Sequence, residues 1–168
     1  MRITKSSRHS KITGDFAERL VLYWLSKYGF ECAFVDHVGL DIIARNPHTR
    51  ELMGISVKSR SRHTGTEQSY LGIPNDNLVK LDEACISFGC VPYFAVVIDA
   101  ADTIRCYIVS KAHLLKVCPP GEKIVTWSMV KTATDKYELD ENIKHFHFAT
   151  GTAKWWSDQG PGRDVGTG

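Results

Sequence analysis

Two charged side chains stand inside apolar stretches of the sequence, where a charge is costly unless something offsets it. Asp41 lies in the run GLDIIA, and an acid in so apolar a run must sit at a strand end or be held by a partner. Lys58 lies in the run ISVKSR, where strand alternation puts Ser56, Lys58 and Arg60 on one face and the aliphatic residues in the core. A metal ion, or a lysine on the neighbouring strand, would satisfy Asp41.

Glu18 is a third candidate for the same place. It lies at the edge of the apolar stripe of an expected helix, roughly 20° past Leu25 on a wheel of about 100° per residue, and could lean over the sheet toward Asp41. Carboxylates hold Mg²⁺ through oxygen, the metal lowers the pKa of its bound water, and a lysine steadies the attacking water or the developing negative charge. Together the three residues form a small site suited to phosphodiester hydrolysis.

Hydrophobic periodicity predicts the elements that must position these residues. Thr13 is a suitable N-cap for a first helix that ends before Gly29, and Pro74 with Asn75 opens a second helix that ends before Gly89. The apolar runs between and after the helices read as strands. The order is therefore helix, three strands, helix, two strands, at residues 14–28, 30–37, 38–46, 51–60, 75–88, 91–98 and 103–110.

The remaining segments give weaker patterns. Residues 61–74 are polar and read as a loop, 111–118 as a short helix and 123–130 as a further strand. The segment from Phe146 onward reads as a tail. We divide the chain into a basic N-terminal arm at 1–10, a single domain at 11–150 and a Gly- and Trp-containing tail at 151–168. For Trp155 and Trp156 in that tail, base stacking, docking on the protein's own surface and packing on a second subunit all stay open.

Bulk properties favour one intracellular domain. The chain has 168 residues, 43% hydrophobic and 24% charged, which is enough for one core and too few for two ordinary domains. No stretch approaches the roughly 20 apolar residues of a membrane helix and no signal peptide opens the chain, so we expect a cytoplasmic protein. The five cysteines form no CxxC pair and are read as reduced core residues.

A formal charge of +2 does not by itself indicate a polyanionic partner, but the basic residues are clustered. One cluster opens the chain and another follows the lysine strand, and a solvated surface is the alternative reading for each. As nucleic-acid contacts we predict Arg8, Lys11, Arg60, Arg62, His63 and Lys80.

The order and spacing of these motifs resemble a known superfamily. The segment GDFAERLVLYWLSKYGF, followed by GLDIIARN, ISVKSR and the helix leading into GCVPYFAVVI, looks like the PD-(D/E)xK nuclease superfamily, and is most similar to archaeal Holliday-junction resolvases. The resemblance spans about residues 11–110. It implies an α/β restriction-endonuclease-like core, in which helices flank a central mixed sheet.

By position, the resemblance implies roles for individual residues. Glu18 matches the glutamate of the first helix near the metal, and Asp41 matches the metal-binding aspartate. Lys58 matches the lysine of the motif, and the backbone carbonyl of Val57 would be a further metal ligand. The departure is Ser56, where the family usually places Glu, Asp or Gln. A neutral hydroxyl is a weak ligand for a hard cation.

Three functions follow, in order of preference. The first is a Mg²⁺- or Mn²⁺-dependent endonuclease acting on branched DNA or on a specific duplex site, and a homodimer is left open. The second is a DNA-binding protein on a nuclease scaffold, with little or no cleavage because Ser56 replaces an acid. The third is a protein-interaction module, in which Asp41 and Lys58 only form an ion pair at a sheet end.

Overall fold

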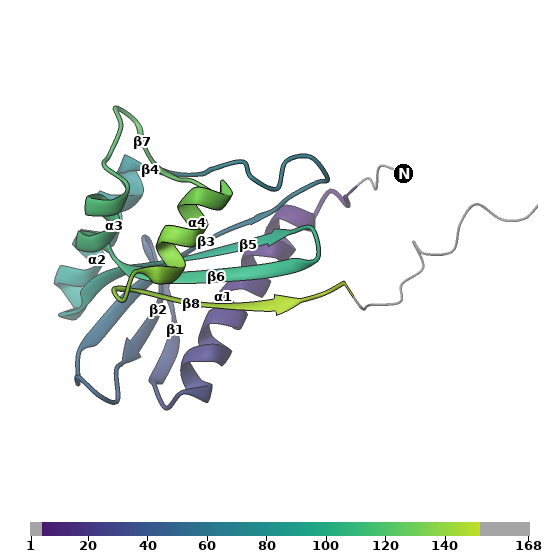
Figure 1. Ribbon diagram of the computed structural model, residues 1–168. Coiled ribbons are helices and arrows are strands. Elements are labelled where there is room, and N and C mark those ends of the chain that lie inside the picture. The colour runs from purple at the N-terminus through teal and green to yellow at the C-terminus, as the bar shows by residue number, and fades with distance from the viewer. Residues whose placement is uncertain (1–4, 152–168) are drawn as a thin grey trace, which may run out of the picture.

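A six-stranded mixed sheet organises the chain, and the computed structural model describes residues 5–151 (Figure 1). Twelve helices and strands follow one another in this region: α1 His9–Lys27, β1 Glu31–His37, β2 Leu40–Arg45, β3 Leu52–Ser61, β4 Leu71–Pro74, α2 Asn75–Phe88, β5 Val91–Ala100, β6 Thr103–Ser110, α3 Lys111–Val117, β7 Ile124–Trp127, α4 Lys131–Leu139 and β8 Ile143–Ala149.

The strand order in the sheet is β1-β2-β3-β5-β6-β8. Neighbours pair antiparallel except β3 and β5, which are parallel and are joined through β4 and α2. A parallel pair needs such a crossover, because a short turn can only reverse the chain. The predicted α/β class, the central mixed sheet and the order helix, three strands, helix, two strands are confirmed.

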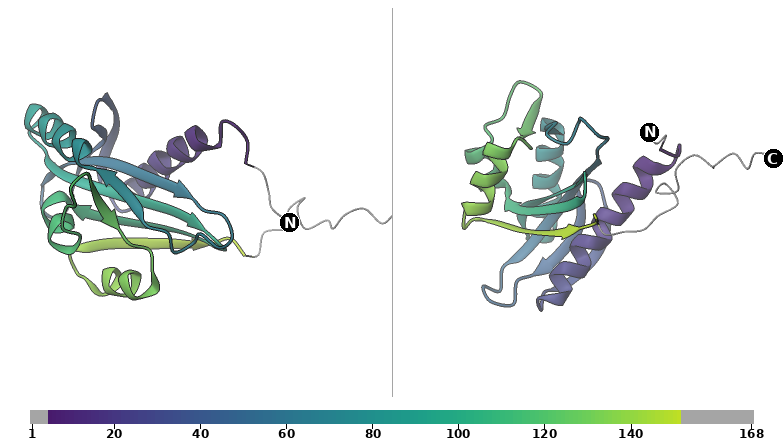
Figure 2. Two further views of the ribbon diagram at one scale, coloured as in Figure 1. Left: turned by 90° about the horizontal axis from the view of Figure 1, so that it is seen from above. Right: turned by 45° about the vertical axis from the view of Figure 1, so that its right-hand side comes forward.

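Helices cover both faces of the sheet (Figures 1 and 2). On one face α1 packs through Ala17, Val21 and Leu25, in a core with alternate residues of β2, β3, β5 and β6. On the other face α2, α3 and α4 pack with the small β4–β7 sheet, around Trp127 and Tyr107. Strands covered on both faces are continuously apolar, as the run in β5 is.

The first helix begins earlier than the sequence suggested. We expected Thr13 to be the N-cap, but α1 begins at His9, and the Thr13 hydroxyl donates a hydrogen bond of 2.8 Å to the His9 carbonyl one turn back. At an N-cap a threonine oxygen accepts from a backbone N–H, whereas inside a helix the hydroxyl donates to a carbonyl one turn back. Threonine suits both places, so the residue type alone did not fix the boundary. Residues 9 and 10 of the expected basic arm are therefore helical.

The second half of the chain holds more regular structure than we expected. Within the expected loop at 61–74, Leu71–Pro74 forms β4, which pairs with β7 in a separate two-stranded sheet. The segment after residue 130 contains α4, which we did not predict. Part of the expected tail from Phe146 onward is strand β8, which pairs with β6 and forms the outer edge of the large sheet. The expected tail from 152 onward lies outside the described residues.

Two glycines let the layers approach closely near the predicted site. Gly39, in the β1–β2 turn, has a φ of +87°, and a Cβ there would meet the Lys80 backbone of α2 at 2.6 Å. A Cβ on Gly54 of β3 would meet the Cys85 Sγ at 2.6 Å. Any larger residue would push α2 away from β2 and β3.

The cysteines were predicted to be core residues, and three of the five are. All five are free, and Cys85, Cys106 and Cys118 are buried. Among the helices of residues 5–151, none has the length and apolar character required to cross a membrane.

Candidate active site

Asp41 sits where β2 and β3 separate. The last pair of their ladder is Ile42 with Ile55, yet β3 continues to Ser61 while pairing with β5 on its other side. We call this point of separation the fork. Beyond it, no strand among residues 5–151 pairs with the edge of β3 that faces away from β5. Asp41 partly fills the fork, because its Oδ2 accepts hydrogen bonds from the Val57 backbone N–H at 2.6 Å and from the Ser56 hydroxyl at 3.3 Å.

Ser56 is the only polar residue among the fully buried residues of the described chain, with 1% of its surface exposed. Its hydroxyl satisfies part of Asp41. A hydroxyl so buried is not placed to attack a substrate. It occupies the position where we expected an acid by resemblance, directly beside the aspartate.

Val57 presents its backbone to the same fork. Its N–H donates a hydrogen bond to Asp41. Because the N–H and C=O of one strand residue point to the same side, the Val57 carbonyl also faces the open edge of β3. Its side chain points the other way and packs on the α1 core. The prediction that this carbonyl is a metal ligand therefore agrees with its orientation.

Lys58 lies on the same face of β3 as Ser56 and is half-buried. Burial lowers the pKa of its ammonium group, the nearby Arg60 and Lys80 lower it further, and the carboxylates of Asp41 and Glu18 raise it. None of the ion pairs between described side chains involves Lys58. The alternative of a closed Asp41–Lys58 ion pair at the sheet end is thus not what the described residues form.

Glu18 reaches the fork from α1. It lines a cavity of about 250 Å³ together with Asp41, Asp15 and Asp36. Burial raises the pKa of the Glu18 carboxyl, and the charges of Asp41 and Asp15 raise it further. The two predicted metal-binding carboxylates therefore repel each other across one cavity.

The donor set fits a hard divalent cation with few protein ligands. Among residues 5–151 no three His, Cys, Asp or Glu side chains are grouped closely enough to hold a metal ion. A cation at the fork would instead rest on Asp41, Glu18 and the Val57 carbonyl, with water completing its shell, as Mg²⁺ commonly does. It would also offset the repulsion that raises the pKa of Glu18.

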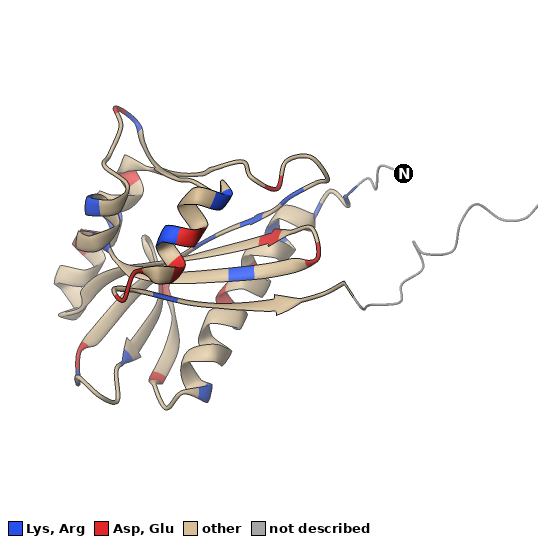
Figure 3. Cartoon of the chain, in the orientation of Figure 1, with Lys and Arg blue, Asp and Glu red and all other residues tan. Residues whose placement is uncertain are grey.

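A second, polar groove of about 500 Å³ continues from Lys58 along the open edge of β3. Its walls are the start of α1 and the end of β3, and it contains Lys58, Arg60 and His63 of the predicted basic residues. Figure 3 shows Lys and Arg following β3 toward the N-terminal end of α1. The groove also contains Lys5, whose Nζ donates to the Ser61 carbonyl at 2.6 Å.

The other predicted nucleic-acid contacts lie in different surroundings. Arg8 is exposed at the N-cap of α1, and the exposed Lys11 pairs with Asp15 at 3.3 Å. Lys80 is exposed on α2 and is close enough to affect the pKa of Lys58.

Arg62 is half-buried and is turned toward the loop that follows β3. Its guanidinium donates to the carbonyls of Ser69 at 3.1 Å and Tyr70 at 2.6 Å, so it holds the 62–70 loop. The contact of Arg62 with nucleic acid stays a prediction.

Three residues near the site were not predicted from the sequence to be part of it: Asp15, Asp36 and Lys5. Asp36 lies near the fork because β1 and β2 form a hairpin, with an irregularity between Phe34 and His37. The hairpin itself was a signal that Asp36 and Asp41 would be neighbours. Lys5 belongs to the first basic cluster, and only the return of the chain past β3 brings it to Ser61.

Comparison with known proteins gives a likeness among solved structures. No protein-family model and no curated protein matches the sequence of this chain. Among solved structures it is similar to Hjc, a Holliday junction resolvase from the archaeal hyperthermophile Archaeoglobus fulgidus, with a TM-score of 0.53 and 22% identity over 73% of this chain and 88% of that chain. The likeness shows that the two chains share an α/β fold.

Proposed function

We propose that this protein is a metal-dependent endonuclease that hydrolyses phosphodiester bonds of DNA. The observation that carries the proposal is the fork between β2 and β3, where Asp41, the Val57 carbonyl and Lys58 face one open strand edge and Glu18 approaches from α1. The fold shared with a Holliday junction resolvase supports it. Branched DNA is accordingly the first substrate class to test, and specific duplex sites are the second.

Each residue has a distinct part in this proposal. Asp41, Glu18 and the Val57 carbonyl hold Mg²⁺ or Mn²⁺, which when bound supplies a water of lowered pKa and neutralises charge on the phosphate. Lys58 is placed to donate a hydrogen bond to the attacking water or to a phosphate oxygen that gains charge. Its partial burial strengthens that interaction, because less water competes for the ammonium group.

The strand of DNA would continue from the fork into the polar groove. The groove contains three basic residues, Lys5, Arg60 and His63. Ser59 and the N-terminal end of α1 also line it. Cations and backbone N–H groups at a helix N-terminus bind phosphate without reading sequence. This surface would therefore position a backbone and leave base recognition to other parts of the chain.

The decisive experiment is cleavage of plasmid and branched DNA with Mg²⁺ or Mn²⁺, comparing wild type with Asp41→Asn. Asparagine keeps an oxygen that accepts from the Val57 N–H, whereas alanine would leave that donor unsatisfied at a cost of about 1–3 kcal/mol. We expect Asp41→Asn to lose cleavage while its melting temperature and DNA affinity stay close to those of wild type. Equal cleavage by both proteins would rule the proposal out.

A specific observation favours a second candidate, a DNA-binding protein that cleaves little. The buried Ser56 stands where an acidic ligand is expected, and the Val57 N–H and the Ser56 hydroxyl both occupy Asp41 Oδ2. Calorimetric titration with Mn²⁺ separates the two candidates. The nuclease binds the ion through the fork and loses this binding in Asp41→Asn, whereas the second candidate binds DNA with a steep salt dependence and no specific ion.

A further inference from the structure

Two free cysteines meet where α2 ends. Cys85 is buried in the last turns of the helix, and the half-buried Cys90 directly follows Gly89. Gly89 has a φ of +65°, the Cys90 N–H donates to the Cys85 carbonyl at 2.8 Å, and the Gly89 N–H donates to the Ile86 carbonyl at 3.4 Å. This is the Schellman motif, which commonly brings the side chain after the left-handed glycine into contact with one near the end of the helix. Here those side chains are Cys90 and Cys85.

The packing of α2 on β3 brings the same two side chains to one point. Gly54 of β3 has no side chain, and a Cβ there would lie 2.6 Å from the Cys85 Sγ and 3.1 Å from the Cys90 Cβ. The Cys90 Sγ lies 3.7 Å from the Phe88 carbonyl, so a change of rotamer at Cys90 would swing its sulfur toward Cys85. Two cysteines whose Cβ atoms face each other across a tight turn satisfy the geometric requirement of a disulfide.

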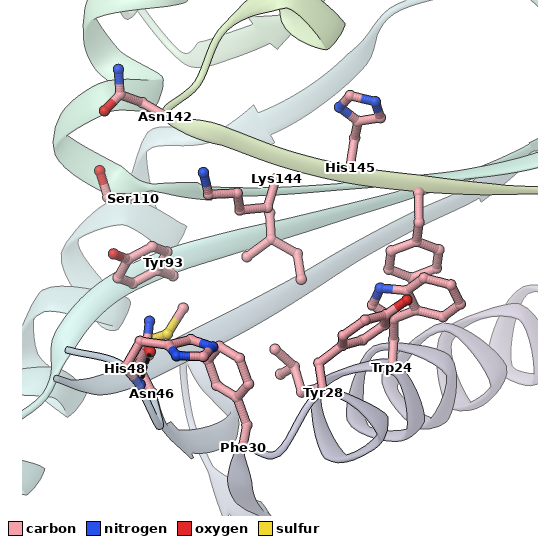
Figure 4. Close-up of a pocket in the computed structure, with 14 residues that line it drawn as sticks. Trp24, Tyr28, Phe30, Asn46, His48, Tyr93, Ser110, Asn142, Lys144 and His145 are labelled. Carbon is pink, nitrogen blue, oxygen red and sulfur yellow. Dashed lines mark hydrogen bonds between the residues drawn. The ribbon is translucent and has the colours of Figure 1, made fainter. Parts of the chain in front are cut away.

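The pair is reached from solvent through the turn at the end of α2. Around Cys90, the side chains of Ile86, Phe88 and Val91 are exposed. Both cysteines belong to the core on the α2 face of the sheet. The aromatic groove of about 580 Å³ in Figure 4, which includes Trp24, lies on the α1 face and does not lead to the thiols.

The two thiols differ in how readily they react. Burial, with a contribution from the nearby Cys90, raises the pKa of Cys85 to about 11. Burial also raises the pKa of Cys90, but the charge of Arg45 lowers it. The thiolate is the attacking form in thiol–disulfide exchange, and it must also be accessible. Cys90 is therefore the first thiol to react, and Cys85 is the second.

We propose that Cys85 and Cys90 are an oxidative modification site, where a small disulfide such as oxidised glutathione converts the two thiols into one disulfide bond. The Cys90 thiolate attacks one sulfur of the small disulfide, which gives a mixed disulfide and releases one small thiolate. Cys85 loses its proton to water and attacks the Cys90 sulfur, which closes the protein disulfide and releases the second small thiolate. The two protein thiols lose two electrons, and the small disulfide gains them.

The new bond fixes the end of α2 on β3. It lies over Gly54, two residues before Ser56 and on the same face of the strand. Oxidation therefore locks the helix that also packs on Gly39, beside the fork. This inference does not depend on whether the chain cleaves DNA.

Thiol counting on the full-length chain tests the proposal. The folded protein is incubated with oxidised glutathione, the remaining thiols are alkylated in denaturant, and the peptides are analysed by mass spectrometry. We expect the number of free thiols to fall from five to three, with a Cys85–Cys90 bond that dithiothreitol reverses. The buried Cys106 and Cys118 should stay free.

Single variants separate the two steps. Cys85→Ala lacks the second thiol, so a glutathione adduct should accumulate on Cys90. Cys90→Ala lacks the first thiol, and the buried Cys85 should take up glutathione at least about tenfold more slowly. The matched control is Cys32→Ala, which removes a half-buried cysteine of β1 and should form the disulfide as wild type does.

Three outcomes would overturn the proposal. If folded wild type kept all five thiols while the denatured chain was oxidised, the pair would not be reactive in the fold. If the adduct on Cys90 persisted in wild type as it does in Cys85→Ala, the two sulfurs would not meet. A disulfide that included Cys32 or linked two chains would assign the reactivity to another cysteine.

Discussion

Replacing Ser56 with glutamate tests directly whether a missing acid limits metal binding at the fork. The Ser56 hydroxyl lies 3.3 Å from Asp41 Oδ2 and is almost completely buried, so the new carboxylate would stand beside Asp41 with little water between them. Two unit charges about 4 Å apart repel by roughly 4 kcal/mol at an effective dielectric constant of about 20. Partial protonation and the nearby Lys58 relieve part of this repulsion, so we expect the metal-free protein to lose about 2 kcal/mol.

The loss should be visible in thermal denaturation. For a domain of this size, about 2 kcal/mol lowers the melting temperature by roughly 4–8 °C. Free Mn²⁺ at about one hundred times its dissociation constant stabilises the protein that binds it by about 2.7 kcal/mol, which restores the melting temperature. Calorimetry should show tighter Mn²⁺ binding than in wild type, and cleavage should rise.

Ser56→Gln is the matched control, because glutamine has the shape of glutamate without its charge. We expect Mn²⁺ to raise its melting temperature by less than it raises that of Ser56→Glu, because the neutral amide adds no charge to the site. If the two variants were destabilised equally and Mn²⁺ restored neither, the side chain at position 56 would not share a site with Asp41. The assignment of the fork as a metal site would then be wrong.

Three other perturbations follow from the site. The pKa of Glu18 in the folded protein is raised above 4.5, so ionisation of Glu18 destabilises the metal-free fold as pH rises from 4.5 through that pKa. In thermal denaturation scans, Glu18→Gln should therefore have a higher melting temperature than wild type at pH 7 and the same melting temperature below pH 4.5. Lys58→Met should abolish cleavage and leave binding of DNA in a mobility-shift assay largely intact, and retained cleavage would remove the lysine from the mechanism. Arg60→Ala should lower the slope of log K for DNA binding against log[salt] by about one. Arg62→Ala should leave that slope unchanged and speed proteolysis within the 62–70 loop. A slope that changed in Arg62→Ala and not in Arg60→Ala would contradict the geometry.

The sequence predicted the sheet because its strands are long and apolar, and it predicted the neighbourhood of Asp41 and Lys58 because strand alternation fixes which side chains share a face. The four-residue strand β4 was not predicted, since it has too few positions to show a period, whereas β7 lies within the strand predicted at 123–130. The hydrogen bonds from Arg62 to the Ser69 and Tyr70 carbonyls were also not predicted, because contacts within a loop leave no periodic signal. The chemical roles of the residues at the fork stay predictions.

Gly39 and Gly54 hold α2 close to the fork, and this spacing constrains how the protein can vary between species. A side chain at Gly39 would collide with the backbone of α2, so we expect relatives that keep this spacing to keep that glycine. A side chain at Gly54 would meet the Cys85 Sγ, so a larger residue there requires a smaller one at position 85. The signature in this chain is G-x-D, which runs from the β1–β2 turn into β2, followed by G-x-x-x-K on β3, with the residue two before the lysine free to change. Relatives with an acid there and relatives with serine there would then form two groups on one scaffold, separated by a single position.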